Sequence, residues 1–173
     1  IIHSLLDHHN EQGGNDLMEA CIKSAEWLLK VQSADGSWRQ FTFHQLSSNT
    51  MTASALIRLA SITGEKEYEL AGEKNIEFAL GLQAENGYFK GNGFDSSSTA
   101  FTITMAYSIA GVLEAGILTG NERWKNAALK GLVPVMNKVN ENGFLVGMLD
   151  ENFHSDSSFS CLPGSCLMAI NAY

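Results

Sequence analysis

The sequence is poor in the residues that tie a chain to a disulfide framework, a metal or a nucleic acid. It has three cysteines, none in a CxxC pair, which argues against a disulfide framework. Its 11 lysines and arginines form no cluster and are outnumbered by 19 acidic residues. This charge balance disfavours binding to the phosphate backbone of a nucleic acid. We therefore expect no metal, no cofactor and no nucleic-acid partner. A reducing compartment, the cytoplasm, is the expected location.

Long apolar runs are also missing. No apolar stretch approaches the roughly 20 residues that cross a bilayer, and no signal-peptide pattern is present. Hydrophobic residues still make up 45% of the chain and charged residues only 17%, which is too apolar for disorder. We expect one domain over residues 1–173, large enough to bury a core and without a transmembrane segment.

One pattern occurs three times, at residues 25–38, 76–89 and 132–145. Each copy is an apolar helical run, then a polar residue, then Asp-Gly or Asn-Gly followed by an aromatic residue. The glycines at 36, 87 and 143 set spacings of 51 and 56 residues. A repeat of this length predicts units that bury their apolar faces only against their neighbours. The polar residues of the three copies are Gln32, Gln83 and Asn140.

Helices of two kinds are predicted to alternate along the chain. Residues 50–62 and 102–118 carry one charge each, whereas residues 65–83 carry seven and residues 121–138 carry five. The nearly uncharged helices are expected to be packed on all sides, and the charged helices to face water on one side. Pro134 is expected to end or kink the last of these helices.

Three further helices complete the prediction. One covers about residues 1–9, one runs from Asn15 or Asp16 to about Gln32, and one begins at Pro163 or Gly164. Alternating inner and outer helices predict an all-α fold, an α/α toroid of helical hairpins. A solenoid of helix pairs is the alternative, but its two helices usually differ less in charge.

The predicted helices amount to about half of an (α/α)6 barrel. Inner helices that are almost uncharged need cover on both flanks, and exposed apolar walls usually mark interfaces. We therefore expect this chain to be part of a larger toroid, or two copies to pair as a homodimer through the open toroid ends.

Specific residues resemble known families. Residues 23–38, KSAEWLLKVQSADGSW, resemble the QW motif of squalene and hopene cyclases, in which Gln and Trp tie an outer helix to its neighbour. The whole chain is similar to a bacterial prenyltransferase/squalene-cyclase-like repeat family, often encoded beside polysaccharide-biosynthesis genes. Residues 48–50, residues 104–107 with 113–116, and residues 160–164 resemble its signatures at successive inner-helix starts. The resemblance implies a terpenoid-cyclase-like or six-hairpin glycosidase-like toroid, with binding roles for Asn49, Tyr107 and Cys161.

The chain departs from triterpene cyclases at their Asp-rich acid motif. The comparable stretch, residues 95–100, has one carboxylate and three serines. Protonation of an alkene needs an unusually strong acid, so this chain alone is not expected to cyclise squalene.

The loops before the inner helices hold the candidate site. In a toroid these loops line the mouth of the central cavity, and paired carboxylates among aromatic residues suit glycoside chemistry. The candidate catalytic residues are Asp95, Asp150 and His154. The alternative is that these loop residues are solvated or cap helices. The candidate substrate-binding residues are Trp38, His44, Asn49, Phe94, Tyr107 and Cys161.

The last loop allows two other arrangements. His154, Asp156 and Cys161 could hold zinc, but the spacing HxDx4C matches no standard signature. Cys161 could be a nucleophile with His154 as its base, although a small core thiol is the simpler reading.

The leading functional hypothesis is a carbohydrate-active or polysaccharide-biosynthesis-associated toroid protein that binds a sugar or a lipid-linked sugar. If it is an enzyme, it would be glycoside hydrolase-like or epimerase-like. The first alternative is an isoprenoid-handling protein, which a cavity of mostly Phe and Leu would favour. The second alternative is a non-catalytic binding or scaffold module.

Overall fold

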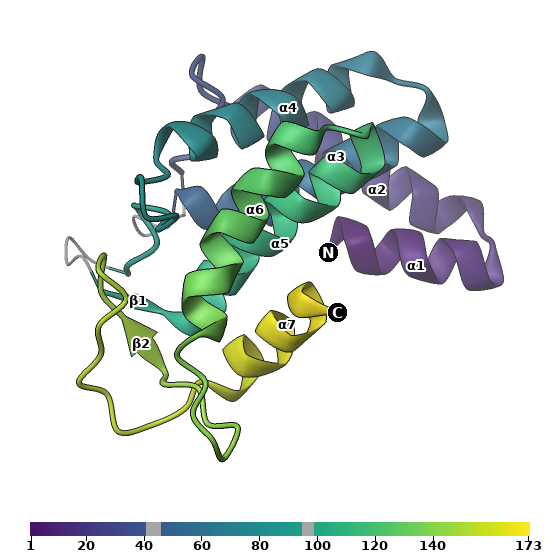
Figure 1. The fold of residues 1–173 in the computed structure, drawn as a ribbon. Coiled ribbons are helices and arrows are strands. Elements are labelled where there is room, and N and C mark those ends of the chain that lie inside the picture. The colour runs from purple at the N-terminus through teal and green to yellow at the C-terminus, as the bar shows by residue number, and fades with distance from the viewer. Residues whose placement is uncertain (41–45, 95–98) are drawn as a thin grey trace.

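The computed structural model describes residues 1–40, 46–94 and 99–173, and these residues form seven α-helices (Figure 1). The two strands, β1 and β2, are two residues each and pair antiparallel, with Ala100 opposite Leu149. The seven helices and the near absence of sheet in the described residues confirm the all-α prediction. The helices are α1 (Ile2–Gln12), α2 (Asn15–Val31), α3 (Thr50–Thr63), α4 (Lys66–Gly81), α5 (Thr102–Thr119), α6 (Glu122–Met136) and α7 (Leu162–Ala172), with a 3-10 turn, η1 (Ser47–Asn49), before α3 and the strands β1 (Ala100–Phe101) and β2 (Met148–Leu149).

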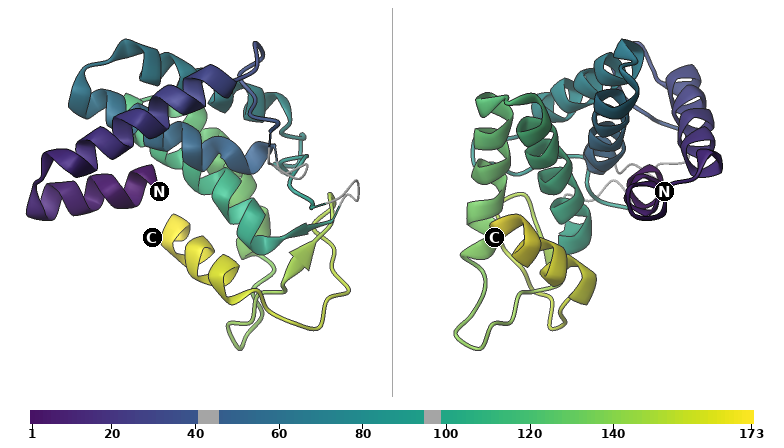
Figure 2. Two further views of the ribbon diagram at one scale, coloured as in Figure 1. Left: turned by 180° about the vertical axis from the view of Figure 1, so that it is seen from behind. Right: turned by 90° about the vertical axis from the view of Figure 1, so that its right-hand side faces the viewer.

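Consecutive helices pack as hairpins in two layers. Helix α3 packs against α4 and α5, and α5 packs against α3, α6 and α7. Figure 2 (right) shows α2, α4 and α6 on the outside of α1, α3 and α5, with α7 beside α5. Charge explains the layers, because α3 and α5 have one charged residue each, Arg58 and Glu114, and so can be covered on most sides.

Among the described residues, one helix, α5, is long and apolar enough to span a bilayer. Only its length and composition point to a membrane. Of its 18 residues, 61% are buried against the neighbouring helices. The core helix of a globular domain has this combination of composition and burial.

A glutamine at the end of each of two outer helices bonds the next outer helix. The Gln32 side-chain amide donates to the Ala71 carbonyl of α4 at 2.8 Å and to the Gly36 carbonyl of its own turn at 3.0 Å. Gln83 repeats both bonds, to Ala127 of α6 at 2.8 Å and to Gly87 at 3.2 Å. We call this pair of bonds the glutamine clamp.

The glycine of each clamped turn lies directly on the next helix. Gly36 and Gly87 have φ angles of 87° and 95°, which side chains rarely adopt. A Cβ on Gly36 would overlap the Lys74 carbonyl, and one on Gly87 would overlap the Lys130 carbonyl. The two glycines are therefore required both by the turn and by the close contact between helices.

The third turn has a different register from the one predicted. The Asn140 N–H donates to the Phe144 carbonyl, as Ser33 does to Ser37 and Ala84 does to Tyr88. Asn140 thus corresponds to Ser33 and Ala84, and pairing it with Gln32 and Gln83 was wrong. Val139 stands at the clamp position, and it has no amide to donate.

The prediction for Pro134 holds only in part, because α6 runs two residues past it to Met136. A proline cannot donate to the carbonyl four residues earlier, which here belongs to Lys130. The Lys130 carbonyl, which therefore accepts no bond from residue 134, packs against Gly87 of the second turn.

A buried amide fixes the starts of the inner helices. Asn92 is 1% exposed, and its Oδ1 accepts hydrogen bonds from the hydroxyls of Ser47 and Ser108, both at 2.8 Å. Thr104 donates to the Asn92 carbonyl at 2.9 Å. The chain between α4 and α5 is therefore bonded to both α5 and the residues before α3.

The clamp makes a direct prediction for stability. Gln32→Ala and Gln83→Ala each remove two hydrogen bonds and leave a carbonyl of the next helix without its donor, so each should lower the free energy of unfolding by about 1–3 kcal/mol. Chemical denaturation measures this loss. The matched control is Gln12→Ala, at an exposed glutamine in the last turn of α1. Losses equal to the control's would show that the clamp does not stabilise the fold.

Candidate functional site

Three helices bring a histidine, a serine and a glutamate together. Nε2 of His3 on α1 lies 3.1 Å from Ser54 Oγ on α3 and 3.4 Å from Glu114 Oε2 on α5. The Ser54 hydroxyl donates to Glu114 Oε2 at 2.9 Å. Ser54 is fully buried, whereas the side chains of His3 and Glu114 are 21% and 34% exposed. We call these three residues the polar cluster.

The cluster fixes the tautomer of His3. Nε2 is also 3.1 Å from the Met51 carbonyl, which can only accept a hydrogen bond. Nε2 must therefore carry the proton, and its neighbours on α3 and α5 all offer acceptor oxygens. Nδ1 is left as the ring nitrogen that can accept a proton or a hydrogen bond from another molecule.

A second polar pair lies one turn further along α1. Arg58 on α3 donates to Asp7 Oδ1 on α1 at 2.5 Å, and the Arg58 side chain is 22% exposed. The single charged residues of the two inner helices, Arg58 and Glu114, are thus both bonded to α1. Because α3 and α5 are otherwise uncharged, these contacts make the α1-facing side their polar side.

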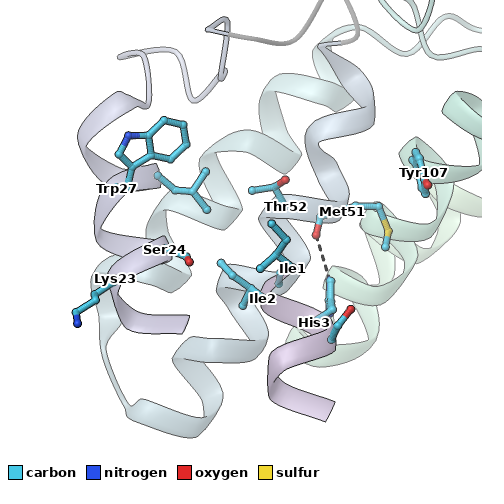
Figure 3. A pocket seen from close by; sticks show the side chains of 12 residues that line it. Ile1, Ile2, His3, Lys23, Ser24, Trp27, Met51, Thr52 and Tyr107 are labelled. Carbon is cyan, nitrogen blue, oxygen red and sulfur yellow. Dashed lines mark hydrogen bonds between the residues drawn. The ribbon is translucent and has the colours of Figure 1, made fainter. Parts of the chain in front are cut away.

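One pocket, which we call the main pocket, adjoins the polar cluster at His3 and has a volume of about 800 Å³. Its two ends differ (Figure 3). At one end lie His3, Met51 and Tyr107, with the tyrosine 40% exposed. At the other end lie Lys23, Ser24 and Trp27 of α2, with the tryptophan 50% exposed. The remaining lining residues are Ile1, Ile2, Ser4, Leu28, Thr52 and Ala55.

Tyr107 was predicted to bind substrate, and the structure places it in this pocket. It is an exposed aromatic residue on the otherwise well-packed helix α5. An aromatic ring beside fixed hydrogen-bonding groups is a common arrangement in ligand pockets. Its binding role stays a prediction.

Trp38 and Asn49 form a structural contact. Trp38 is 4% exposed, and its indole N–H donates to the Leu28 carbonyl of α2 at 2.9 Å. The Asn49 side-chain amide donates to the Trp38 carbonyl at 3.0 Å. Both residues line a smaller cavity of about 230 Å³ beside Trp27. Trp38 therefore bonds α2 through its indole and Asn49, in the turn before α3, through its backbone carbonyl.

Phe94 and Cys161 lie away from the main pocket's lining. Phe94 is 54% exposed and contacts Phe101 edge to face, with the ring centroids 5.6 Å apart. Cys161 is half-buried at the start of α7. Nothing in these contacts assigns either residue to a ligand.

Asp150 and His154 are brought together in a turn. Asp150 Oδ1 accepts from the backbone N–H groups of His154 at 2.7 Å and Asn152 at 2.9 Å. The His154 N–H bond is the main cause that lowers the pKa of Asp150, and the nearby His154 and Lys138 charges lower it further. The His154 ring is 76% exposed, and its Nδ1 lies 3.9 Å from Asp150 Oδ2. This geometry is that of a carboxylate holding its own turn, and the catalytic role stays a prediction.

Asp95 and His44 lie outside the described residues, so the structure does not place them. Within the described ranges, no three His, Cys, Asp or Glu side chains group as metal ligands, so His154, Asp156 and Cys161 form no such group. All three cysteines are free thiols.

The polar cluster is the part of the site that the sequence prediction missed. His3, Ser54 and Glu114 are 51 and 60 residues apart, and no local motif links them. The available signal was the single charged residue in each nearly uncharged helix. A lone charge in a packed helix needs a partner, since an unpaired buried charge is costly.

Neither a protein-family model nor a curated protein matches this sequence. Among solved structures, the Lin0763 protein from Listeria innocua superposes with a TM-score of 0.65 over 94% of this chain and 50% of that chain, at 19% identity. A novel alpha-amylase from Clostridium perfringens superposes with a TM-score of 0.52 over 76% of this chain and 41% of that chain, at 14% identity. At these identities the likeness shows the helical fold alone. The chain spans half or less of the length of either structure.

The buried indole gives the first prediction for this region. Trp38→Ala should lower the free energy of unfolding by about 3–5 kcal/mol, the usual cost of emptying a buried tryptophan site. Trp38→Phe should cost less, because the phenyl ring leaves a smaller cavity than alanine does, although it also loses the bond to Leu28. If Trp38→Ala left the melting temperature unchanged but abolished ligand binding, the indole would be a binding platform.

The surroundings of Tyr88, which include the turn at Asp150, predict that this tyrosine loses its proton at a higher pH than an ordinary tyrosine. Burial, with the charges of Asp150 and Glu151, raises the pKa of Tyr88 to about 12. The folded state therefore favours neutral Tyr88, and this contribution to stability is complete below the ordinary pKa near 10 and lost as pH rises toward about 12. The ultraviolet absorbance of tyrosinate should show this late step, and Tyr88→Phe should remove it.

Two variants sharpen the measurement. Asp150→Asn should move the late step to lower pH, because it removes one of the charges that disfavour ionised Tyr88. Tyr173→Phe, at a fully exposed tyrosine, should leave the late step in place. A late step that survives Tyr88→Phe would contradict the assignment.

Proposed function

We propose that this chain is part of an α/α toroid protein that binds a sugar or a lipid-linked sugar at the Tyr107 end of the pocket. The observation that carries the proposal is the polar cluster beside an exposed tyrosine on the inner helices. The alternation of inner and outer helices supports the toroid, and the likeness to larger helical structures is consistent with it. The cysteine content and free thiols support action in a reducing compartment.

The lining fits a sugar better than an isoprenoid. Sugars present hydroxyl groups on one edge and apolar C–H faces on the other, and so call for fixed polar groups beside an aromatic ring. The pocket offers the hydroxyls of Ser4, Thr52 and Tyr107 together with the His3 ring. Its lining includes one leucine, Leu28, and no phenylalanine, but it also has other apolar residues, so the preference for a sugar rests on the polar groups at the Tyr107 end.

The chemistry that suits these residues is proton transfer. The Met51 carbonyl accepts from the His3 Nε2–H, and Glu114 Oε2 lies 3.4 Å from Nε2, so Nδ1 can serve as a base and Glu114 as its positioning residue. Glycoside hydrolysis requires two carboxyl groups on either side of the scissile bond. The described acids on this side, Asp7 and Glu114, are each bonded to a neighbouring base or hydroxyl. An epimerase-like reaction or simple binding therefore fits better than hydrolysis.

The test is a panel of mono- and oligosaccharides, nucleotide sugars and prenyl diphosphates, screened by thermal shift and then by calorimetry. His3→Ala and Tyr107→Ala should each weaken sugar binding at least about tenfold, which corresponds to about 1.4 kcal/mol. The matched control is His8→Ala, an exposed histidine on the same helix. Stabilisation by prenyl diphosphates alone would favour the isoprenoid alternative. Equal effects of His3→Ala and His8→Ala would remove His3 from the site.

A further inference from the structure

Two outer helices receive a turn at the same positions. On α4 the first turn is bonded to the Ala71 carbonyl through Gln32, and its Gly36 lies on Lys74. In addition, the Asn75 side-chain amide donates to the Gly36 carbonyl at 3.0 Å.

The second turn docks on α6 in the same way. Gln83 donates to the Ala127 carbonyl, and Gly87 lies on Lys130 and Gly131. The receiving positions in α4 and α6 are therefore an alanine, then a lysine three residues later, then a small or amide residue.

Helix α2 has the same receiving positions. The spacing of 51 residues that relates Gln32 to Gln83 relates α2 to α4, and it places Ala20 and Lys23 where α4 has Ala71 and Lys74. Ser24 falls at the position of Asn75. We call Ala20, Lys23, Ser24 and Trp27 the α2 face.

No described turn covers the α2 face. Lys23 is exposed, Trp27 is 50% exposed, and Lys23, Ser24 and Trp27 form one end of the main pocket (Figure 3). The Ala20 carbonyl accepts a bond from the Ser24 hydroxyl at 2.8 Å. On α4 the residue equivalent to Trp27 is Phe78, which is covered by the Arg39 guanidinium, 5.5 Å from the ring centre, from the segment after the first turn.

Chain order identifies the occupant. Gly36 precedes the start of α3 by 14 residues, and Gly87 precedes the start of α5 by 15 residues. Each docked turn therefore leads into the inner helix that pairs with the receiving outer helix. By the same rule, a turn that docks on α2 leads into α1.

We propose that the α2 face is the docking site for a further glutamine–glycine turn, which closes an outer helix and belongs to the polypeptide that runs into α1. A second copy of this chain fits the face less well. Its remaining turn, around Gly143, has Val139 in place of the clamping glutamine, and its α7 would require the space of α1. The proposal concerns the α2 end of the pocket and is independent of ligand binding at the Tyr107 end.

The experiment places a copy of residues 66–101 directly before Ile1, which supplies an outer helix, the second turn and its connecting segment. The melting temperature should rise by about 5 °C, which corresponds to a gain of about 1–2 kcal/mol for a chain of this size. The emission of Trp27 should also shift to the blue as the indole is covered. The matched control carries Gly87→Ala within the added copy, and it should show neither change.

Variants at Ser24 of α2 test whether the added turn docks on the α2 face. Ser24→Asn introduces the amide that α4 uses, and it should increase the gain in melting temperature. Ser24→Tyr should block the face and abolish the gain. Identical melting and emission for the extended chain and its Gly87→Ala control would overturn the proposal.

Two further measurements test the proposal without the fusion and test whether a second copy occupies the α2 face. A peptide of residues 66–90 contains no tryptophan, so titrating it into the unmodified chain should shift the Trp27 emission, and the Gly87→Ala peptide should not. Sedimentation of the unmodified chain gives its oligomeric state. A dimer that Ser24→Tyr dissociates would assign the face to a second copy and would also overturn the proposal.

Discussion

The contact between a turn and the next outer helix is the interaction on which the rest of the structure depends. A side-chain amide bonds one carbonyl of that helix, and a glycine brings the turn backbone onto another. These two contacts set the distance between successive outer helices. The inner helices pack against one another in the layer beneath, where Gly111 of α5 lies directly against Thr50 of α3. Small residues at these points are a packing requirement, because a larger one would overlap backbone.

This packing explains why the polar residues of the inner helices matter. A helix surrounded by neighbours tolerates a charge only where a partner can reach it. In α3 and α5 that position faces α1, and Arg58 and Glu114 both use it. Tyr107 and His3 both line the pocket, so an exposed aromatic residue and the histidine that contacts Glu114 lie at one end of it. The helices thus present fixed hydrogen-bonding groups on a surface made of regular structure, where side chains are held more firmly than in loops.

Much of the fold followed from the sequence because its signals are local. The charge contrast between residues 50–62 and 65–83 predicted two helices and their layers. The third turn was misregistered because Asn140 is polar like Gln32, although Asn140 stands three residues before its glycine and Gln32 stands four residues before its own. The backbone bonds agree with the spacing. The polar cluster was missed because its members come from three helices and share no spacing. Sequence patterns report neighbours along one helix, and the cluster depends on how α1 crosses α3 and α5.

The clamps also bear on how the chain folds. Each joins residues only 39 or 44 positions apart, so the contacts that fix the helix order close short loops in a chain of 173 residues. Closing a loop within one repeat costs less entropy than closing one between the two ends of the chain. Each hairpin can dock as soon as its turn and the following helix exist. Assembly can therefore proceed in order from one repeat to the next during synthesis, without waiting for the distant end of the polypeptide.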